Sequence, residues 1–255
     1  MQGVLKKDSV ENPLVTVITV VYNGESFLEE TIKSVISQTY SNVEYIVVDG
    51  GSTDKTLSII RKYSHAIDYW ISEPDNGIYD AMNKGIGFSR GSFVSILNSD
   101  DYYFKDTALE EIMEMSSNAA IAGNTHILDE CSGKLSIFEG LKGKLNIQIP
   151  FMHPAFLVKK EVYERIGCFD RRYKVAADCD FIMRVYSCED IYISDIDFVV
   201  MRSGGVSDSS FVKGRMEYFT CYLRNTKDFP GALLGLVYTV SLFYLGRLKR
   251  AVWKA

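Results

Sequence analysis

A repeated pattern of apolar run, polar turn and amphipathic segment constrains the fold of this chain more than any other feature of its sequence. Short apolar runs of this kind are typical of strands buried on both faces of a parallel sheet. They span residues 14–21, 43–48, 67–71 and 93–97. Amphipathic helices are predicted after them, beginning near Ser26, Thr56, Ile78 and Thr107. The alternation predicts an α/β fold with a doubly wound, mostly parallel sheet and right-handed crossovers.

Side-chain caps are predicted at two of these helix starts. Ser26 is followed by Glu29, and Thr107 by Glu110, at the spacing of a capping box. In such a box the hydroxyl and the glutamate each accept a hydrogen bond from the other residue's backbone N–H. Both helices should therefore begin at these residues.

Polar residues cluster where three of the predicted strands end, at positions 22–25, 49–54 and 98–101. Ligands of open α/β sheets bind outside the carboxyl ends of the strands, so the three clusters should line one crevice. In the last cluster Asp100 and Asp101 are neighbouring carboxylates, which repel each other. A divalent cation with oxygen ligands would compensate them, while an ordinary solvated turn is the alternative.

Composition narrows the class of protein. The chain is 47% hydrophobic and 24% charged, as in a packed globular protein. Its formal net charge of -5 argues against a nucleic-acid partner, which requires a basic surface. Five cysteines and three histidines lack zinc-like spacing. Residues 1–12 are polar and lack the apolar core of a secretory signal, so we expect a reducing, cytoplasmic setting.

The pattern loosens after residue 119. Further strands are expected at residues 120–128, 135–138 and 191–201, and short helices at 161–166 and from Asp178 onwards. Acidic residues favour a helix start, because they interact well with the helix dipole.

The C-terminal part has a different character. Residues 233–245 are mostly apolar and aromatic, and Arg247, Lys249, Arg250 and Lys254 follow. A spanning helix needs about 20 apolar residues, so this run is short for one. An interfacial helix with a basic flank attracted to anionic lipid and an amphipathic helix that closes the domain are equal alternatives.

Five motifs in this order carry a family resemblance. They are residues 16–23, 49–54, 73–85, 98–101 and 177–180. With them the chain resembles the family 2 glycosyltransferases of the GT-A fold, particularly the bacterial branch that builds surface polysaccharides, from about residue 15 to 207. The resemblance implies a Rossmann-like three-layer fold with a mostly parallel central sheet and a C-terminal helical extension.

The expected organisation follows from these motifs and from the C-terminal segment. Residues 1–12 form an N-terminal tail and residues 13–229 the GT-A domain. Residues 13–118 are its nucleotide-sugar-binding half and residues 119–229 its acceptor and catalytic half. Residues 230–255 form an amphipathic, membrane-associating segment.

The resemblance also assigns residues to the donor. Tyr22, Glu25 and Asp49 match positions that hold the base and ribose, with Asp49 accepting from the uracil N–H. Lys84 lies in a segment that approaches the donor. Asp100 would contact the ribose side, and Asp101 would ligate the Mn²⁺ or Mg²⁺ that bridges the diphosphate.

On the acceptor side, Asp178 matches the family's catalytic aspartate, the general base of a single inverting displacement. The family usually has Glu immediately before this aspartate, whereas this chain has Ala177. A plain helix cap is the alternative for Asp178. His153 and Asp180 are further candidates near the acceptor, with a buried structural role as the alternative for His153. Arg202 is a candidate for closing over the donor phosphates, with a simple strand-to-helix turn as the alternative.

The resemblance implies a hexosyltransferase that uses UDP-glucose or UDP-galactose. Its acceptor would be a saccharide on an undecaprenyl diphosphate carrier, used for O-antigen or capsule, and met by a peripheral protein at the inner leaflet of the cytoplasmic membrane. Two other classes remain open: a nucleotidyltransferase that makes sugar nucleotides, and a non-catalytic protein that binds them. The former ordinarily has a glycine-rich phosphate loop after its first strand, and residues 22–25 are not one.

Overall fold

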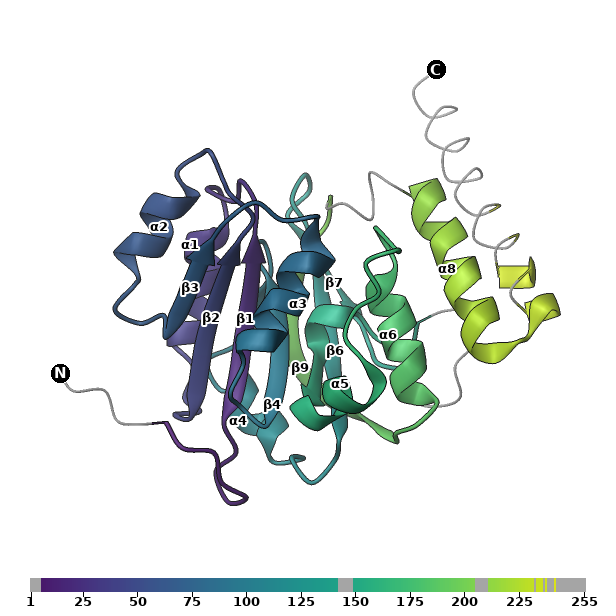
Figure 1. Cartoon of the computed structure of the whole chain (residues 1–255), viewed down its shortest axis with the longest axis horizontal. Helices are drawn as coiled ribbons and strands as arrows, with labels where there is room; N and C mark the ends of the chain where they lie inside the picture. Colours follow the sequence, from purple (N-terminus) through teal and green to yellow (C-terminus); the bar gives the residue numbers. More distant parts are fainter. Residues whose placement is uncertain are drawn as a thin grey trace.

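A nine-stranded sheet forms the centre of the computed structural model, which describes residues 6–141, 149–204, 211–231, 233–235, 237 and 241. Within these residues the strand order is β3-β2-β1-β4-β8-β6-β9-β5, and β7 pairs with β6 (Figure 1). Four parallel strands start this order. They are β1 (Val15–Val21), β2 (Val43–Asp49), β3 (Tyr69–Ser72) and β4 (Phe93–Asn98). The four predicted strands are confirmed, with ends shifted by one or two residues.

Helices cover both faces of this parallel part, which explains why β1 is buried along its whole length. Alternate residues of β1 belong to two cores: Ile18 and Val20 pack on one face, and Val15, Val17 and Val21 on the other. The first core includes residues of α3 (Ile78–Phe88), and the second includes residues of α1 (Leu28–Ile36), α2 (Thr56–Lys62) and α4 (Ala108–Met113). The result is a three-layer α/β arrangement.

The two predicted capping boxes do not form. The N-cap of α1 is Phe27 rather than Ser26, and it makes no side-chain cap hydrogen bond. Thr107 is the N-cap of α4, but its hydroxyl donates to Glu111 at 2.7 Å instead of capping the backbone. A capping box requires extended backbone at the cap residue; Thr107 has φ -94° and ψ 2°.

The second half of the sheet is mixed. β8 (Phe156–Lys159) runs antiparallel to β4 and to β6 (Ala120–Asp129), whereas β9 (Ile191–Arg202) runs parallel to β6. The short β5 (Tyr102–Tyr103) and β7 (Lys134–Phe138) pair antiparallel with β9 and β6. The strands predicted at 120–128, 135–138 and 191–201 are thus confirmed. The parallel ladder predicted from the N-terminal half ends at β4.

The helices of the second half pack on the face that carries α3 (Figure 1). They are α5 (Lys160–Ile166), α6 (Ala177–Tyr186) and α8 (Phe211–Thr226); the short η1 (His153–Ala155) precedes β8, and its Ala155 belongs to the core on the other face. α5 ends at Gly167, whose φ of +84° suits a residue without a side chain. α8 lies beside α6 at the end of the molecule farthest from β3.

Most of the predicted segment 230–255 lies outside the described residues. Across those that are described, no helix combines the length and the apolar character needed to cross a bilayer.

Candidate functional site

The three polar clusters meet at one edge of the sheet. In the strand register Val21 of β1 lies beside Asp49 of β2, and Val20 lies beside Asn98 of β4. Parallel pairing therefore brings the carboxyl ends of the three strands together, as the sequence predicts.

Hydrogen bonds join the first two clusters. The hydroxyls of Ser52 and Thr56 accept from the backbone N–H groups of Asn23 and Gly24, at 2.7 and 2.9 Å. The side-chain carbonyl of Asn23 accepts from the backbone N–H of Thr53 at 2.9 Å. The loops after β1 and β2 thus form one rigid wall of the site.

The predicted base-binding and ribose-binding residues lie along this wall. Tyr22 is 66% exposed at the rim, and the Glu25 carboxylate accepts from the backbone N–H of Lys55 at 2.9 Å. Asp49 is fully buried: its carboxylate accepts from the hydroxyl and N–H of Ser52 and, at 2.6 Å, from the Ser72 hydroxyl. In this structure the hydrogen bonds of the Asp49 carboxylate hold the loop that follows β2, whereas the Tyr22 side chain is accessible to a ligand.

Lys84, on α3, makes an ion pair with Glu73 at 2.8 Å. The Glu73 carboxylate raises the pKa of the Lys84 ammonium. The lysine is charged at neutral pH and lies beside the loop between β3 and α3.

The two neighbouring aspartates differ in accessibility. Asp101 is 1% exposed, and its carboxylate accepts from the Asn98 side-chain amide at 2.9 Å. Asp100 is only partly buried. Burial, and next the charge of Asp100, raises the pKa of Asp101 well above its usual value. Burial also raises the pKa of Asp100, against the opposing charge of Arg202. The protein alone therefore supplies too little positive charge near these two carboxylates to keep both of them ionised as readily as in water.

The cluster fits a divalent cation that is shared with a phosphate ligand. The buried carbonyl oxygen of the Asn98 side chain has no hydrogen-bond partner, and the Asp100 carboxylate is accessible. Among the described residues no group of three His, Cys, Asp or Glu side chains is placed to hold a metal. Mg²⁺ commonly binds through one or two carboxylates, and substrate phosphates and water complete its coordination.

The sequence predicts that Arg202 closes over the donor phosphates, but in this structure its side chain makes other contacts. Its guanidinium, 7% exposed, donates to the carboxylates of Glu30 and Glu130 and to the backbone carbonyl of Asp100 at 2.8 Å. The rings of Phe27 and Tyr102 flank it, at 4.5 and 5.0 Å from its centre. Any movement toward a donor phosphate would break two ion pairs, so Arg202 supports the Asp100 loop from beneath.

Asp178 stands in the first turn of α6 and is partly exposed. The N-cap of α6 is Ala176, and Asp178 accepts from the Tyr79 hydroxyl at 2.9 Å. The alternative in which Asp178 caps the helix is therefore not the arrangement that forms. His153 is buried beside it: burial lowers the pKa of the imidazole, and the charge of Asp178 opposes this shift.

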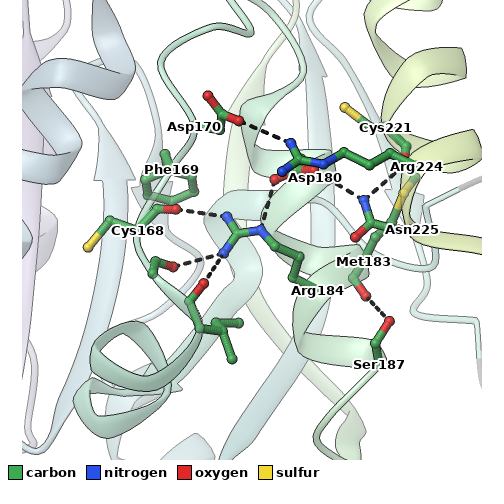
Figure 2. A network of polar contacts seen from close by, with 12 residues as sticks. Cys168, Phe169, Asp170, Asp180, Met183, Arg184, Ser187, Cys221, Arg224 and Asn225 are labelled. Atoms are coloured by element: carbon green, nitrogen blue, oxygen red, sulfur yellow. Dashed lines mark hydrogen bonds and ion pairs between the residues drawn. The ribbon is translucent and has the colours of Figure 1, made fainter.

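Asp180 has a structural position. It is 1% exposed, pairs with Arg184 at 2.8 Å and accepts from the Asn225 side chain at 3.1 Å (Figure 2). The Arg184 guanidinium also binds three backbone carbonyls at the end of α5, those of residues 166–168. Helix ends leave such carbonyls unpaired, so Asp180 and Arg184 fasten α5, α6 and α8 together.

Tyr79 is a site residue that was not singled out from the sequence. It lies within the motif at residues 73–85, and that motif is the signal that could have found it. Its contact with Asp178 joins residues 99 positions apart, which no local spacing indicates.

Solved structures resemble this fold. TarS of Staphylococcus aureus in complex with UDP-GlcNAc matches with a TM-score of 0.65 at 20% identity, over 88% of this chain and 70% of that one. The mannosyltransferase PcManGT of Pyrobaculum calidifontis, in complex with GDP-Man and Mn²⁺, matches with a TM-score of 0.67 at 16% identity, over 97% and 82%. The expected GT-A fold is confirmed.

Sequence relatives give the family. An uncharacterized glycosyltransferase of Mycobacterium tuberculosis is 32% identical over 195 residues, 71% of this chain and 72% of its own. A PGL/p-HBAD biosynthesis glycosyltransferase of Mycobacterium bovis is 28% identical over 69% of this chain and 70% of its own. The family model described as "Glycosyl transferase family 2" matches residues 16–169. With a site of this geometry at the carboxyl edge of its sheet, the chain belongs to glycosyltransferase family 2.

Proposed function

We propose that this protein is an inverting, metal-dependent hexosyltransferase with Asp178 as its general base. The position of Asp178 carries the proposal. Tyr79 of α3 holds it, and the loop before α3 is joined to the end of β2 by a 3.0 Å bond from the Glu73 N–H to the Asp49 carbonyl. These contacts support a position for Asp178 near the sheet edge that carries Asp100.

The chemistry requires two kinds of group. Breaking the bond to a nucleoside diphosphate builds negative charge on the leaving group, which a divalent cation neutralises. An acceptor hydroxyl that attacks from the opposite side must lose its proton, and a partly exposed carboxylate can take it. The hydrogen bond from the Tyr79 hydroxyl to Oδ1 helps to orient the Asp178 carboxylate.

We assign the metal to Asp100 rather than to Asp101. The partial exposure of Asp100 supports this choice, and the burial of Asp101 argues against its direct contact with a ligand. The residues that bind the nucleotide sugar would be Tyr22, Glu25 and Lys84, with Asp49 holding the loop beneath the base.

The proposed donor is UDP-glucose or UDP-galactose, and the proposed acceptor is a saccharide on an undecaprenyl diphosphate in O-antigen or capsule assembly. The UDP-GlcNAc and GDP-Man complexes of the structural neighbours support a nucleotide-sugar donor. For a lipid-linked acceptor the support is the C-terminal region, where Phe229, Leu233, Leu234 and Val237 are exposed and basic residues follow. We accordingly assign residues 13–229 to the catalytic domain and residues 230–255 to membrane association at the inner leaflet.

A panel of UDP- and GDP-sugars tests the function. The full chain is mixed with each donor and a synthetic GlcNAc-diphosphate-lipid, and product mass is measured with Mn²⁺, with Mg²⁺ and with chelator. We expect transfer of a hexose from a UDP-sugar with inverted anomeric configuration, and none with chelator. Transfer that persists in chelator would contradict the metal requirement.

The Asp178→Asn variant tests the base. We expect turnover to fall about 100-fold or more, in the range by which general bases contribute, with donor affinity retained. Turnover close to that of the wild type would overturn the assignment of Asp178.

A further inference from the structure

A carboxylate on α8 binds the backbone immediately before Asp178. The Oε2 atom of Glu217 accepts from three consecutive N–H groups, those of Lys174, Val175 and Ala176, at 2.9, 2.7 and 3.1 Å. Hydrogen bonds from neutral donors to an ionised acceptor are roughly twice as strong as bonds between neutral groups. Glu217 therefore fixes the course of the chain where it enters α6.

This contact holds the residue at which α6 begins, where the local sequence provides no side-chain cap. The first N–H groups of any helix lack partners within the helix. The N-cap of α6 is Ala176, whose methyl group cannot accept a hydrogen bond. Glu217 binds the Ala176 N–H from 41 residues away, so the start of α6 depends on a different helix.

The same short segment is held from the other side by α3. The Tyr79 hydroxyl lies 2.8 Å from the Val175 carbonyl and 2.9 Å from the Asp178 carboxylate. The N–H of Val175 binds Glu217, and its carbonyl faces Tyr79. The single hydroxyl proton of Tyr79 is shared between these two acceptors, and the N–H of Val175 is held by Glu217, three residues before the proposed base.

Packing reinforces the contact with α8. Cys221 lies one helical turn after Glu217 and is fully buried, with its thiol 3.6 Å from the Ala176 carbonyl. Asn225, one turn further, binds Asp180. Glu217, Cys221 and Asn225, on three successive turns of α8, thus contact either the first residues of α6 or Ala176 just before them.

We propose that Glu217 is a positioning residue that holds Asp178 in its working place. The inference rests on the proposed role of Asp178 as the general base. Glu217 does not touch the reacting groups; it acts by fixing residues 174–176. Like Asp178, it lies outside the residues 16–169 that the family model covers.

The test is kinetic and uses the full chain. Glu217→Gln keeps the size of the side chain and removes its charge. We expect kcat to fall about 10- to 100-fold, the effect of misplacing a reacting group by about 1 Å, with the Kd for the UDP-sugar within about twofold of the wild type. Hydrogen–deuterium exchange of the amides of residues 174–176 should become faster.

Two control variants separate this role from general effects. Glu114→Gln removes an exposed carboxylate on the other face of the sheet, and Thr220→Ala alters an exposed residue of α8. Both should retain wild-type kcat and exchange. If Glu217→Gln fails to fold, Glu217→Asp keeps the charge with a shorter reach and should give an intermediate kcat.

The double variant Asp178→Asn/Glu217→Gln tests the route of the effect. If Glu217 acts through Asp178, the second substitution adds little to the loss caused by the first. If the fold losses in kcat of the two single variants instead multiply in the double variant, the inference is contradicted. If Asp178→Asn is nearly inactive while Glu217→Gln retains wild-type kcat, the role proposed for Glu217 is wrong and the proposed base stands. If Asp178→Asn itself turns over like the wild type, the proposed base fails instead.

Discussion

At the scale of single residues, the neighbouring aspartates Asp100 and Asp101 differ in how deeply they are buried. Asp101 points into the protein and is held by Asn98, whereas Asp100 remains accessible and its backbone carbonyl rests on Arg202. The family resemblance gave the metal to Asp101 and the ribose side to Asp100; which carboxylate is buried depends on the turn that follows β4, and the motif does not specify it. The same holds for Arg202, whose two glutamate partners lie 72 and 172 residues away.

Paired substitutions distinguish the two aspartates. In Asp100→Asn we expect the Mn²⁺ concentration for half-maximal activity to rise by at least about tenfold, because a metal ligand should matter no less than an outer-shell partner. In Asp101→Asn we expect a smaller rise, since burial already favours the uncharged form. A manganese titration of initial rates measures both, and the reverse order would return the metal to Asp101.

At the scale of elements, the strands and helices of the N-terminal half were predictable to within two residues of their starts, whereas the contacts that cap the helices were not. Apolar runs mark buried strands directly, because both faces of β1 are covered. The starts of α1, α4 and α6 carry no side-chain cap of their own, and the N–H of Ala176, the N-cap residue of α6, is bound by Glu217 of α8. Such partners are set by packing between distant segments, and no local spacing records them. The antiparallel insertion of β8 between β4 and β6 was missed for the same reason.

A buried glutamate joins the opposite ends of the parallel strands. Glu44 of β2 accepts from the Thr16 hydroxyl and the Arg90 N–H, both at 2.7 Å, and pairs with the Arg90 side chain. Burial alone would raise the pKa of Glu44, but these hydrogen bonds outweigh it and hold the pKa below its usual value. The ionised carboxylate therefore stabilises the fold.

Replacing this glutamate should destabilise the protein in a pH-dependent way. We expect Glu44→Gln to lower the free energy of unfolding at pH 7 by about 1–3 kcal/mol. Because the folded-state pKa lies below the unfolded one, the stabilisation is present above about pH 4.5 and is lost as the pH falls through the folded value. Urea unfolding between pH 3.5 and 7 measures the difference, which should shrink with acid. A constant difference would show that the charge contributes nothing.

At the scale of the whole molecule, the resemblance in the sequence led correctly to the GT-A fold and the glycosyltransferase family, while the donor, the acceptor and the membrane segment remain predictions. Sugar specificity depends on the shape of a pocket, which motifs do not encode. The apolar residues Phe229, Leu233, Leu234 and Val237, at the end of the described chain, are exposed. Their burial requires either a membrane or another part of the protein.

Removal of residues 231–255 tests whether a membrane or another part of the protein covers these apolar residues. We expect the shortened chain to lose flotation with vesicles that contain anionic lipid, and its apparent KM for a vesicle-bound acceptor to rise, because apolar burial and lipid charge are both lost. Its kcat with a short-chain, water-soluble acceptor should remain unchanged. A fall in Tm and in activity on the soluble acceptor, with flotation unaltered, would identify the segment as a helix that closes the domain.

The ladder between β4 and β8 has a mechanical consequence. It pairs Phe93, Val94 and Ser95 with Lys159, Val158 and Leu157, and so carries one hydrogen-bonded sheet from the nucleotide half into the acceptor half. A hinge between the halves would have to break this ladder, in which every residue except Lys159 is buried. The ladder therefore opposes closure of two rigid lobes around the substrates. The two halves of the site share one continuous sheet as their floor.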